Sequence, residues 1–144
     1  MRVLLDTDII FDFLLEREPF FQAARDLILL NTNGQFEGYV SSITPINLFY
    51  HGRKIVGAVQ IRQGIADLLK LVRVCSTTHA CLVQALSLSF ADYEDAVQHS
   101  SAAESGLDAI VTRNLKDYKN ATLPVFSPTD FLARVKSEQE SNLS

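Results

Sequence analysis

The stretch Val3-Leu4-Leu5-Asp6-Thr7-Asp8 joins a short apolar run directly to two carboxylates. An apolar run of this length, ending abruptly in polar residues, is typical of a buried parallel strand. The stretch Ile110-Val111-Thr112-Arg113-Asn114 repeats this pattern far along the chain. Open α/β sheets bind their ligands beyond the carboxyl ends of the strands. The sequence therefore predicts a functional sheet edge that carries both Asp6 and Asn114.

Strands and helices alternate along the rest of the chain. The expected strands are 2–5, 38–41, 72–76, 109–112 and 124–126. The expected helices are 7–15, 19–33, one starting at 42–44, then 59–71, 78–88, 92–105 and a last one from 127–129 onward. Strands separated by helices of this length favour a parallel sheet with helices on both faces. The predicted fold is α/β, a three-layer α/β/α sandwich with a central, mostly parallel sheet.

The 144 residues predict one domain with a core of its own. A hydrophobic fraction of 47% with 21% charged residues is that of a globular protein, which argues against disorder over most of the chain. We expect the domain to comprise residues 1–135. Residues 136–144 form a polar tail that we expect to fray.

Composition also indicates the compartment and limits the function. Cys75 and Cys81 are wrongly spaced for a zinc site, and no secretory signal precedes the first strand, so a cytoplasmic protein is expected. No apolar stretch is long enough to span a bilayer. The net charge of −4 argues against a general nucleic-acid coat protein. It does not exclude a nuclease that holds cations with carboxylates.

Asp95 is expected at the same sheet edge as Asp6. The helix 92–105 leads into a parallel strand and must run antiparallel to it, which places its amino end near the carboxyl ends of the strands. Asp92 and Asp95, three residues apart, share one face of its first turn. Each acid also has a structural interpretation, since Asp92 and Asp6 suit helix caps and Asp95 suits the helix dipole.

Considered together, the acids favour a metal site. Carboxylates gathered at one edge repel each other unless they bind a cation or share protons. Hard oxygen ligands suit Mg²⁺ or Mn²⁺, and metal-assisted hydrolysis of a phosphodiester is the reaction that such a cluster supports.

Two further blocks complete a resemblance to a known family. They are Asp92-Tyr93-Glu94-Asp95-Ala96 and Thr112-Arg113-Asn114-Leu115-Lys116-Asp117-Tyr118. With the first strand, they resemble the PIN domain over nearly the whole chain. The resemblance implies a compact α/β/α domain that binds Mg²⁺ or Mn²⁺ and cuts RNA. Many bacterial members are VapC-like toxins paired with a small antitoxin, commonly as dimers, so an antitoxin partner and a homodimer are expected.

The resemblance also assigns candidate residues. It implies Asp6, Asp95 and Asp117 as catalytic and metal-binding acids, Asn114 and Thr112 as substrate-binding residues, and Asp92, Asn47 and Thr7 as residues beside the ligands. Arg113 is a further substrate-binding candidate, because a basic residue near the acids can contact a phosphate. The toxin branch usually carries a glutamate in the helix after the second strand, where this chain has Asn47. An amide brings no charge, so we predict weaker metal affinity than in relatives with four carboxylates.

Two alternatives remain open at this stage. Asp6-Thr7-Asp8 after a strand also resembles the start of haloacid-dehalogenase-like phosphatases, in which the Thr-Arg-Asn block would have no role. The other alternative is a non-catalytic PIN-like module that binds RNA or protein, which Asn47 and the acidic charge favour. An antitoxin groove or dimer face is expected at Phe11-Asp12-Phe13, Pro19-Phe20-Phe21 or Phe49-Tyr50, although most of these rings also suit a core.

Overall fold

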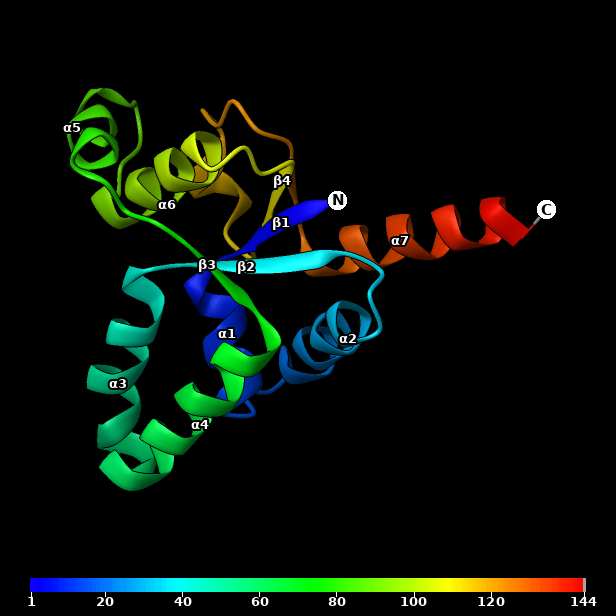
Figure 1. The fold of residues 1–144 in the computed structure, drawn as a ribbon, viewed down its shortest axis with the longest axis horizontal. Coiled ribbons are helices and arrows are strands. Elements are labelled where there is room, and N and C mark those ends of the chain that lie inside the picture. Colours follow the sequence, from blue (N-terminus) through cyan, green and yellow to red (C-terminus); the bar gives the residue numbers. More distant parts are fainter. Residues whose placement is uncertain (144) are drawn as a thin grey trace.

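A computed structural model describes residues 1–143, and within them five strands form one sheet. The strands are β1 (Arg2–Leu5), β2 (Glu37–Ser41), β3 (Arg73–Cys75), β4 (Ala109–Val111) and β5 (Val125–Phe126). Every neighbouring pair is parallel, in the order β3-β2-β1-β4-β5. The expected parallel sheet is confirmed (Figure 1).

The helices also follow the predicted order. They are α1 (Thr7–Leu14), α2 (Phe21–Thr32), α3 (Ile43–Val56), α4 (Ala58–Leu71), α5 (His79–Ser87), α6 (Tyr93–Glu104) and α7 (Pro128–Leu143). A 3₁₀ turn, η1 (Leu115–Tyr118), was not expected, because four residues are too few to show a helical period. None of the helices among residues 1–143 has the length and apolar character needed to cross a membrane.

The sheet separates two apolar layers. Val3 and Leu5 of β1 pack into a core completed by α1, α2, α4 and α7, whereas Leu4 between them faces a second core with Ala102 of α6. This alternation is what the two-residue repeat of a strand dictates. Figure 1 shows α1 to α4 on one side of the sheet and α5 and α6 on the other. The three-layer α/β/α prediction is therefore confirmed.

The strand order reverses beside β1. The chain runs outward from β1 through β2 to β3, and then returns to place β4 on the other side of β1. Leu5 and Val111 are neighbours in the register, and the Asp6 amide donates to the Val111 carbonyl at 3.0 Å. Such a reversal leaves a crevice at the carboxyl ends of the strands, where α/β proteins bind ligands.

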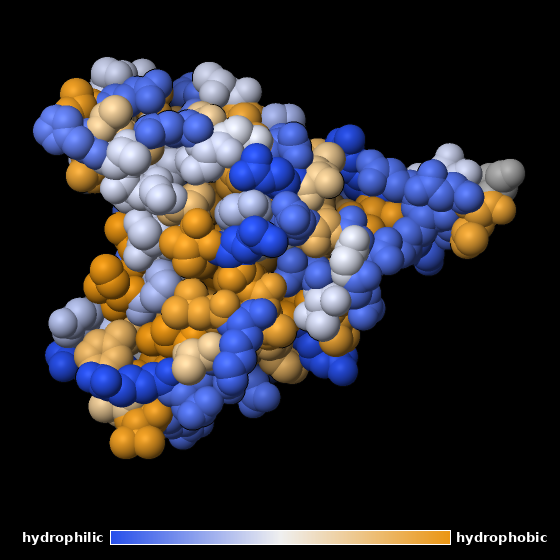
Figure 2. Space-filling model, in the orientation of Figure 1, coloured by the Kyte–Doolittle hydropathy of each residue, from blue (hydrophilic) through white to orange (hydrophobic). Residues whose placement is uncertain are grey.

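Helix α7 projects away from the body of the molecule (Figures 1 and 2). Phe131 and Val135 anchor its first half in the core. The helix then continues through Leu143, where the sequence suggested a frayed tail, because no glycine or proline interrupts it and Arg134 pairs with Glu138 at 3.1 Å. Residue 144 lies outside the described residues. The domain boundary after residue 135 stays a prediction.

Candidate active site

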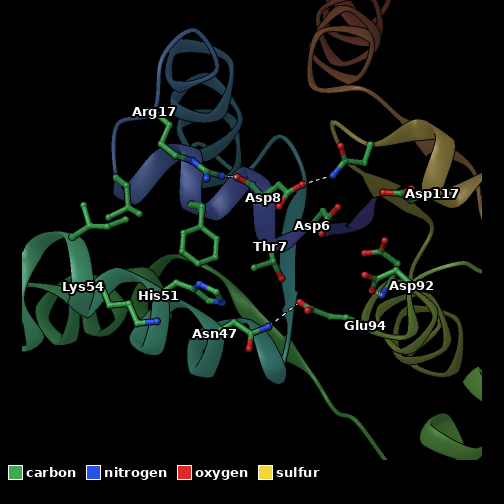
Figure 3. Close-up of a pocket in the computed structure, with 15 residues that line it drawn as sticks. Asp6, Thr7, Asp8, Arg17, Asn47, His51, Lys54, Asp92, Glu94 and Asp117 are labelled. Atoms are coloured by element: carbon green, nitrogen blue, oxygen red, sulfur yellow. Dashed lines mark hydrogen bonds between the residues drawn. The ribbon is translucent and has the colours of Figure 1, made fainter.

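A pocket of about 550 Å³ lies at the carboxyl edge of the sheet. Its walls come from α1, α3, the first turn of α6 and the segment that follows β4 (Figure 3). Six carboxylates line it: Asp6, Asp8, Asp92, Glu94, Asp95 and Asp117. Segments separated by most of the chain thus bring their acids to one place, as the strand ends predicted.

Asp6 lies at the base of this pocket, with only 3% of its surface exposed. Its Oδ1 accepts a hydrogen bond from Gln98 Nε2 at 3.0 Å, and its Oδ2 accepts one from Thr112 Oγ1 at 2.6 Å. Although Asp6 is at the N-cap position of α1, its side chain makes no capping bond, so the alternative of a simple cap is wrong. Burial raises the Asp6 pKa, and the two hydrogen bonds oppose that rise.

Gln98 joins Asp6 to the other residues of the pocket floor. This fully buried side chain donates from Nε2 to Asp6 and to the Tyr118 hydroxyl at 3.2 Å, and its Oε1 lies 3.4 Å from Thr7 Oγ1. The Tyr118 hydroxyl in turn lies 3.4 Å from Asp95 Oδ1. Burial and the charges of Asp6 and Asp95 raise the pKa of Tyr118, so its phenol stays protonated and donates to Asp95. Gln98 therefore connects the acids of β1 and α6.

The first turn of α6 carries three acids with different roles. Asp92 Oδ1 accepts the Asp95 amide at 3.1 Å, which confirms Asp92 as the N-cap. Asp95 is half-buried, and burial raises its pKa to about 7, with the charges of Asp6, Asp92, Asp117 and Glu94 acting in the same direction. Asp95 is thus more than a dipole acid, because its carboxyl belongs to the pocket.

Glu94 is a pocket acid that the sequence interpretation missed. Its Oε1 accepts a hydrogen bond from Asn47 Nδ2 at 2.8 Å across the pocket (Figure 3). Burial raises the Glu94 pKa and the Asp92 charge adds to the rise, while the Asn47 bond opposes it. α6 therefore brings a carboxylate to the side chain that occupies the place of the usual α3 glutamate. The sequence did contain a signal for this contact. Asn47 stands where a glutamate was expected, and Glu94 is an acid between Asp92 and Asp95 to which no role was assigned.

The segment after β4 supplies the remaining candidates. Asn114 and Asp117 line the pocket, and Asn114 Nδ2 donates to the Asp8 carboxylate. Thr112 is fully buried, and its hydroxyl holds Asp6 instead of reaching the open pocket. The Arg113 guanidinium turns away and binds Asp12 through Nε at 2.6 Å, so it does not line this pocket.

The donor set suits a hard cation, although no three His, Cys, Asp or Glu side chains among residues 1–143 form a ready-made cage for a metal ion. Mg²⁺ does not need such a cage, since it keeps several waters and binds through one or two carboxylates. Each Asp6 oxygen accepts one hydrogen bond from the protein and retains a further lone pair. Burial is the main cause of the raised Asp95 pKa, and the repulsion by neighbouring carboxylates that adds to it is the kind that a cation offsets.

Fold and pocket together define a class: α/β/α domains that gather carboxylates where the order of a parallel sheet reverses. A family model described as PIN domain matches residues 2–116. The chain therefore belongs to the PIN domain family. This match favours the PIN interpretation of Asp6-Thr7-Asp8 over the phosphatase alternative. A comparison with curated protein sequences found no match.

Solved structures of similar fold include toxins and a toxin–antitoxin complex. VapBC2 from Rickettsia felis, bound to a DNA fragment from its promoter, has a chain that is 19% identical with a TM-score of 0.67, covering 88% of this chain and 98% of its own. A toxin–antitoxin complex from Klebsiella pneumoniae has a chain that is 20% identical with a TM-score of 0.62, and the match covers 88% of this chain and 97% of that one. VapC20 of Mycobacterium tuberculosis, a toxin that cleaves the sarcin-ricin loop, is 14% identical with a TM-score of 0.62. The match covers 75% of this chain and 86% of VapC20. At these identities the likeness shows a shared fold.

Proposed function

We propose that this chain is a PIN-type ribonuclease that hydrolyses RNA phosphodiester bonds with Mg²⁺ or Mn²⁺. The observation that carries the proposal is the acidic pocket, in which carboxylates from three separate segments share one space. Burial, and after it the charges of these carboxylates, raise the pKa of Asp95. The family match and the RNA-cleaving relative of similar fold add support.

In this proposal the acids hold the cation and the buried side chains hold the acids. Asp6, Asp95 and Asp117 are the proposed ligands, and Glu94 supplies the charge that Asn47 lacks. A bound Mg²⁺ would polarise the phosphate and supply an attacking water. Gln98 and Thr112 fix the two oxygens of Asp6. Asn114 orients Asp8 at the pocket mouth.

The proposed biological role is the toxin of a toxin–antitoxin pair that acts in the cytoplasm. Support comes from the toxin–antitoxin complex of Klebsiella pneumoniae, which has a similar fold. A small antitoxin is accordingly the proposed protein partner, and RNA the proposed substrate. A homodimer is proposed as the working form.

Cleavage of a panel of structured RNAs by the purified chain, with Mn²⁺, Mg²⁺ or EDTA, tests the proposal. We expect metal-dependent cutting that falls at least about a hundredfold in Asp6→Asn and in Asp95→Asn, the loss typical of a positioned catalytic side chain. Asp67→Asn is the matched control, because Asp67 is an exposed acid of α4 that does not line this pocket. Equal cutting by all four proteins would refute the assigned site.

The alternative is a PIN-like module that binds RNA or protein without cutting. The observation in its favour is Asn47, an amide in the place of the usual glutamate. It predicts that the well-folded chain neither cuts RNA nor binds Mn²⁺ in a calorimetric titration. In that case Asn47→Glu is the first variant to examine for restored metal binding.

A further inference from the structure

The pocket has a second wall that the proposed cleavage chemistry does not use. Arg17, His51 and Lys54 line it opposite the carboxylates, Arg17 from the segment after α1 and the other two from the C-terminal half of α3 (Figure 3). We call these three residues the basic rim. A pocket with acids on one wall and cations on the other separates two tasks, namely binding a metal and contacting an anion.

The basic rim is built into the fold. Arg17 Nε donates to Asp12 Oδ1 at 3.0 Å, and Asp12 is almost completely buried. The Arg17 guanidinium also lies 5.3 Å from the centre of the Phe11 ring, within the range of a cation–π contact. The His51 ring meets the same Phe11 edge to face at 5.8 Å. Phe11 and Asp12 thus hold Arg17 and His51 at the pocket before any ligand arrives.

The charge of the rim is only partly compensated. The Asp12 carboxylate forms ion pairs with two guanidinium groups, that of Arg17 and that of Arg113, whose Nε lies 2.6 Å from it. Two cations therefore share one carboxylate. The Lys54 ammonium has no ion pair within residues 1–143 and is exposed. Positive charge thus accumulates at this wall although the whole chain carries a net charge of −4.

The rim suits a phosphate group. The pocket volume of about 550 Å³ is in the range of small-molecule pockets. It is large enough for about one nucleotide and too small for an RNA duplex. An RNA strand entering it meets six carboxylates that repel its phosphates. A cationic wall beside them offsets this repulsion, and the guanidinium fork of Arg17 fits phosphate oxygens.

We propose that Arg17 and Lys54 bind the phosphate next to the one that is cleaved, on a single-stranded segment of RNA, with His51 lining the space between. This inference rests on the proposed ribonuclease function and names the part of the site that selects the substrate. It predicts a preference for unpaired RNA over duplex RNA of the same sequence.

Salt-dependent binding tests the inference separately from cleavage. Fluorescence anisotropy would measure the binding of a fluorescein-labelled single-stranded RNA to the Asp6→Asn variant in EDTA. The same measurement would be made on double variants that also carry Lys54→Ala or Arg17→Gln. Each lost phosphate contact should weaken binding and reduce the slope of log Kd against log salt by about 0.7. Lys70→Ala is the matched control, since Lys70 is an exposed α4 lysine outside the pocket. Lys54→Ala is the variant least expected to disturb the fold, because Lys54 takes part in no ion pair among residues 1–143.

The outcomes separate the two claims. In the chain that keeps Asp6, a Lys54→Ala variant that cuts RNA with a raised KM and an unchanged kcat supports the rim. If that chain cuts RNA but neither rim variant changes the salt slope or KM, the inference is overturned while the proposed function stands. Binding that depends on the rim without any cutting refutes the nuclease, and with it the assignment of the rim to the phosphate beside a cleaved one, and leaves a rim that only binds RNA. A chain that neither binds nor cuts RNA overturns both.

Discussion

Asp95 shows how burial and the charges of the pocket act together on the pKa of one residue. Burial, and after it the charges of four carboxylates, raise its pKa to about 7, against an ordinary value of 3.8. Between these two pH values the folded chain keeps a proton that the unfolded chain has released. The free energy of unfolding therefore falls as pH rises through this window, and the loss is complete above the folded pKa.

Asp95→Asn should remove this loss. In EDTA at about pH 8 we expect the variant to be more stable than the unmodified chain by on the order of 2 kcal/mol, because an amide carries no charge to bury. At about pH 3 the two should be nearly equally stable, since the Asp95 carboxyl is then mostly protonated in both the folded and the unfolded chain. Urea denaturation at several pH values measures the difference. A difference that does not depend on pH would contradict this explanation.

Gln98 should affect metal binding without touching the metal. Gln98→Leu keeps the volume but removes the donor to Asp6 Oδ1 and to Tyr118. We expect Mn²⁺ affinity to fall by about 10- to 100-fold, the usual effect of removing a partner of a metal ligand. Calorimetric titration measures this affinity directly. Gln84→Leu, an exposed change on α5, is the control. An unchanged Mn²⁺ affinity in Gln98→Leu would show that Asp6 needs no such support.

Site residues that follow a strand or belong to a motif could be predicted from the sequence. Residues whose role depends on a contact with a distant part of the chain could not. Asp6, Asn114 and Asp117 are of the first kind, and the structure brings all three to the pocket. Glu94 was missed because its partner, Asn47, lies on another helix. Arg113 was assigned to substrate, but its guanidinium lies against Asp12, a contact 101 residues apart in sequence. Neither pairing leaves a local pattern.

At the scale of the elements, α3 and α4 pack closely at Gly52. A Cβ at this position would lie 2.4 Å from Ile61 Cδ1, too close for any real contact. Position 52 therefore excludes larger residues, and the wall of the pocket that carries Asn47, His51 and Lys54 is fixed against α4.

Gly52→Ala should destabilise the chain although alanine is the better helix former. Crowding typically costs about 1–3 kcal/mol, which exceeds the gain of about 1 kcal/mol in helix propensity. Gly64→Ala is the matched control on α4, where the nearest atom would be 3.7 Å away, and it should stabilise by up to about 1 kcal/mol. Urea denaturation compares the two. Equal stabilisation by both would disprove the close packing.

Most elements were predictable because their patterns are local. The run Val3-Leu4-Leu5 and the cap Asp92 fixed one strand and one helix start. Two features were not predictable. The turn η1 is too short for a periodic pattern, and α7 continues past its last core residue, Val135, where apolar periodicity ends but nothing interrupts the helix.

At the scale of the whole molecule, exposed apolar surface is uneven. Of the aromatic stretches proposed for an interface, Phe11 and Phe13 pack against the core, whereas Phe20 and Tyr50 are exposed. Figure 2 shows apolar side chains gathered over α3 and α4, while α7 is mainly hydrophilic. A shallow groove there is lined by Pro45, Ile46, Phe49, Tyr50 and Arg62.

The purified chain should be a dimer that uses this groove. Because Ile46 lines this groove and is 58% exposed, we expect Ile46→Glu to produce a monomer at micromolar concentration. Light scattering gives the mass. Leu86→Glu, an equally apolar exposed position on α5, is the control that should leave the dimer intact. A monomeric mass for the unmodified chain would eliminate the dimer.

The central claim is that the acids of this pocket hold the cation that cuts RNA. Crystals soaked in Mn²⁺ and measured for anomalous scattering test it most directly, because manganese is then located atom by atom. We predict a peak in contact with Asp6 and Asp95, which disappears in Asp6→Asn. Manganese bound elsewhere, or no manganese at a concentration that supports cleavage, would contradict the claim.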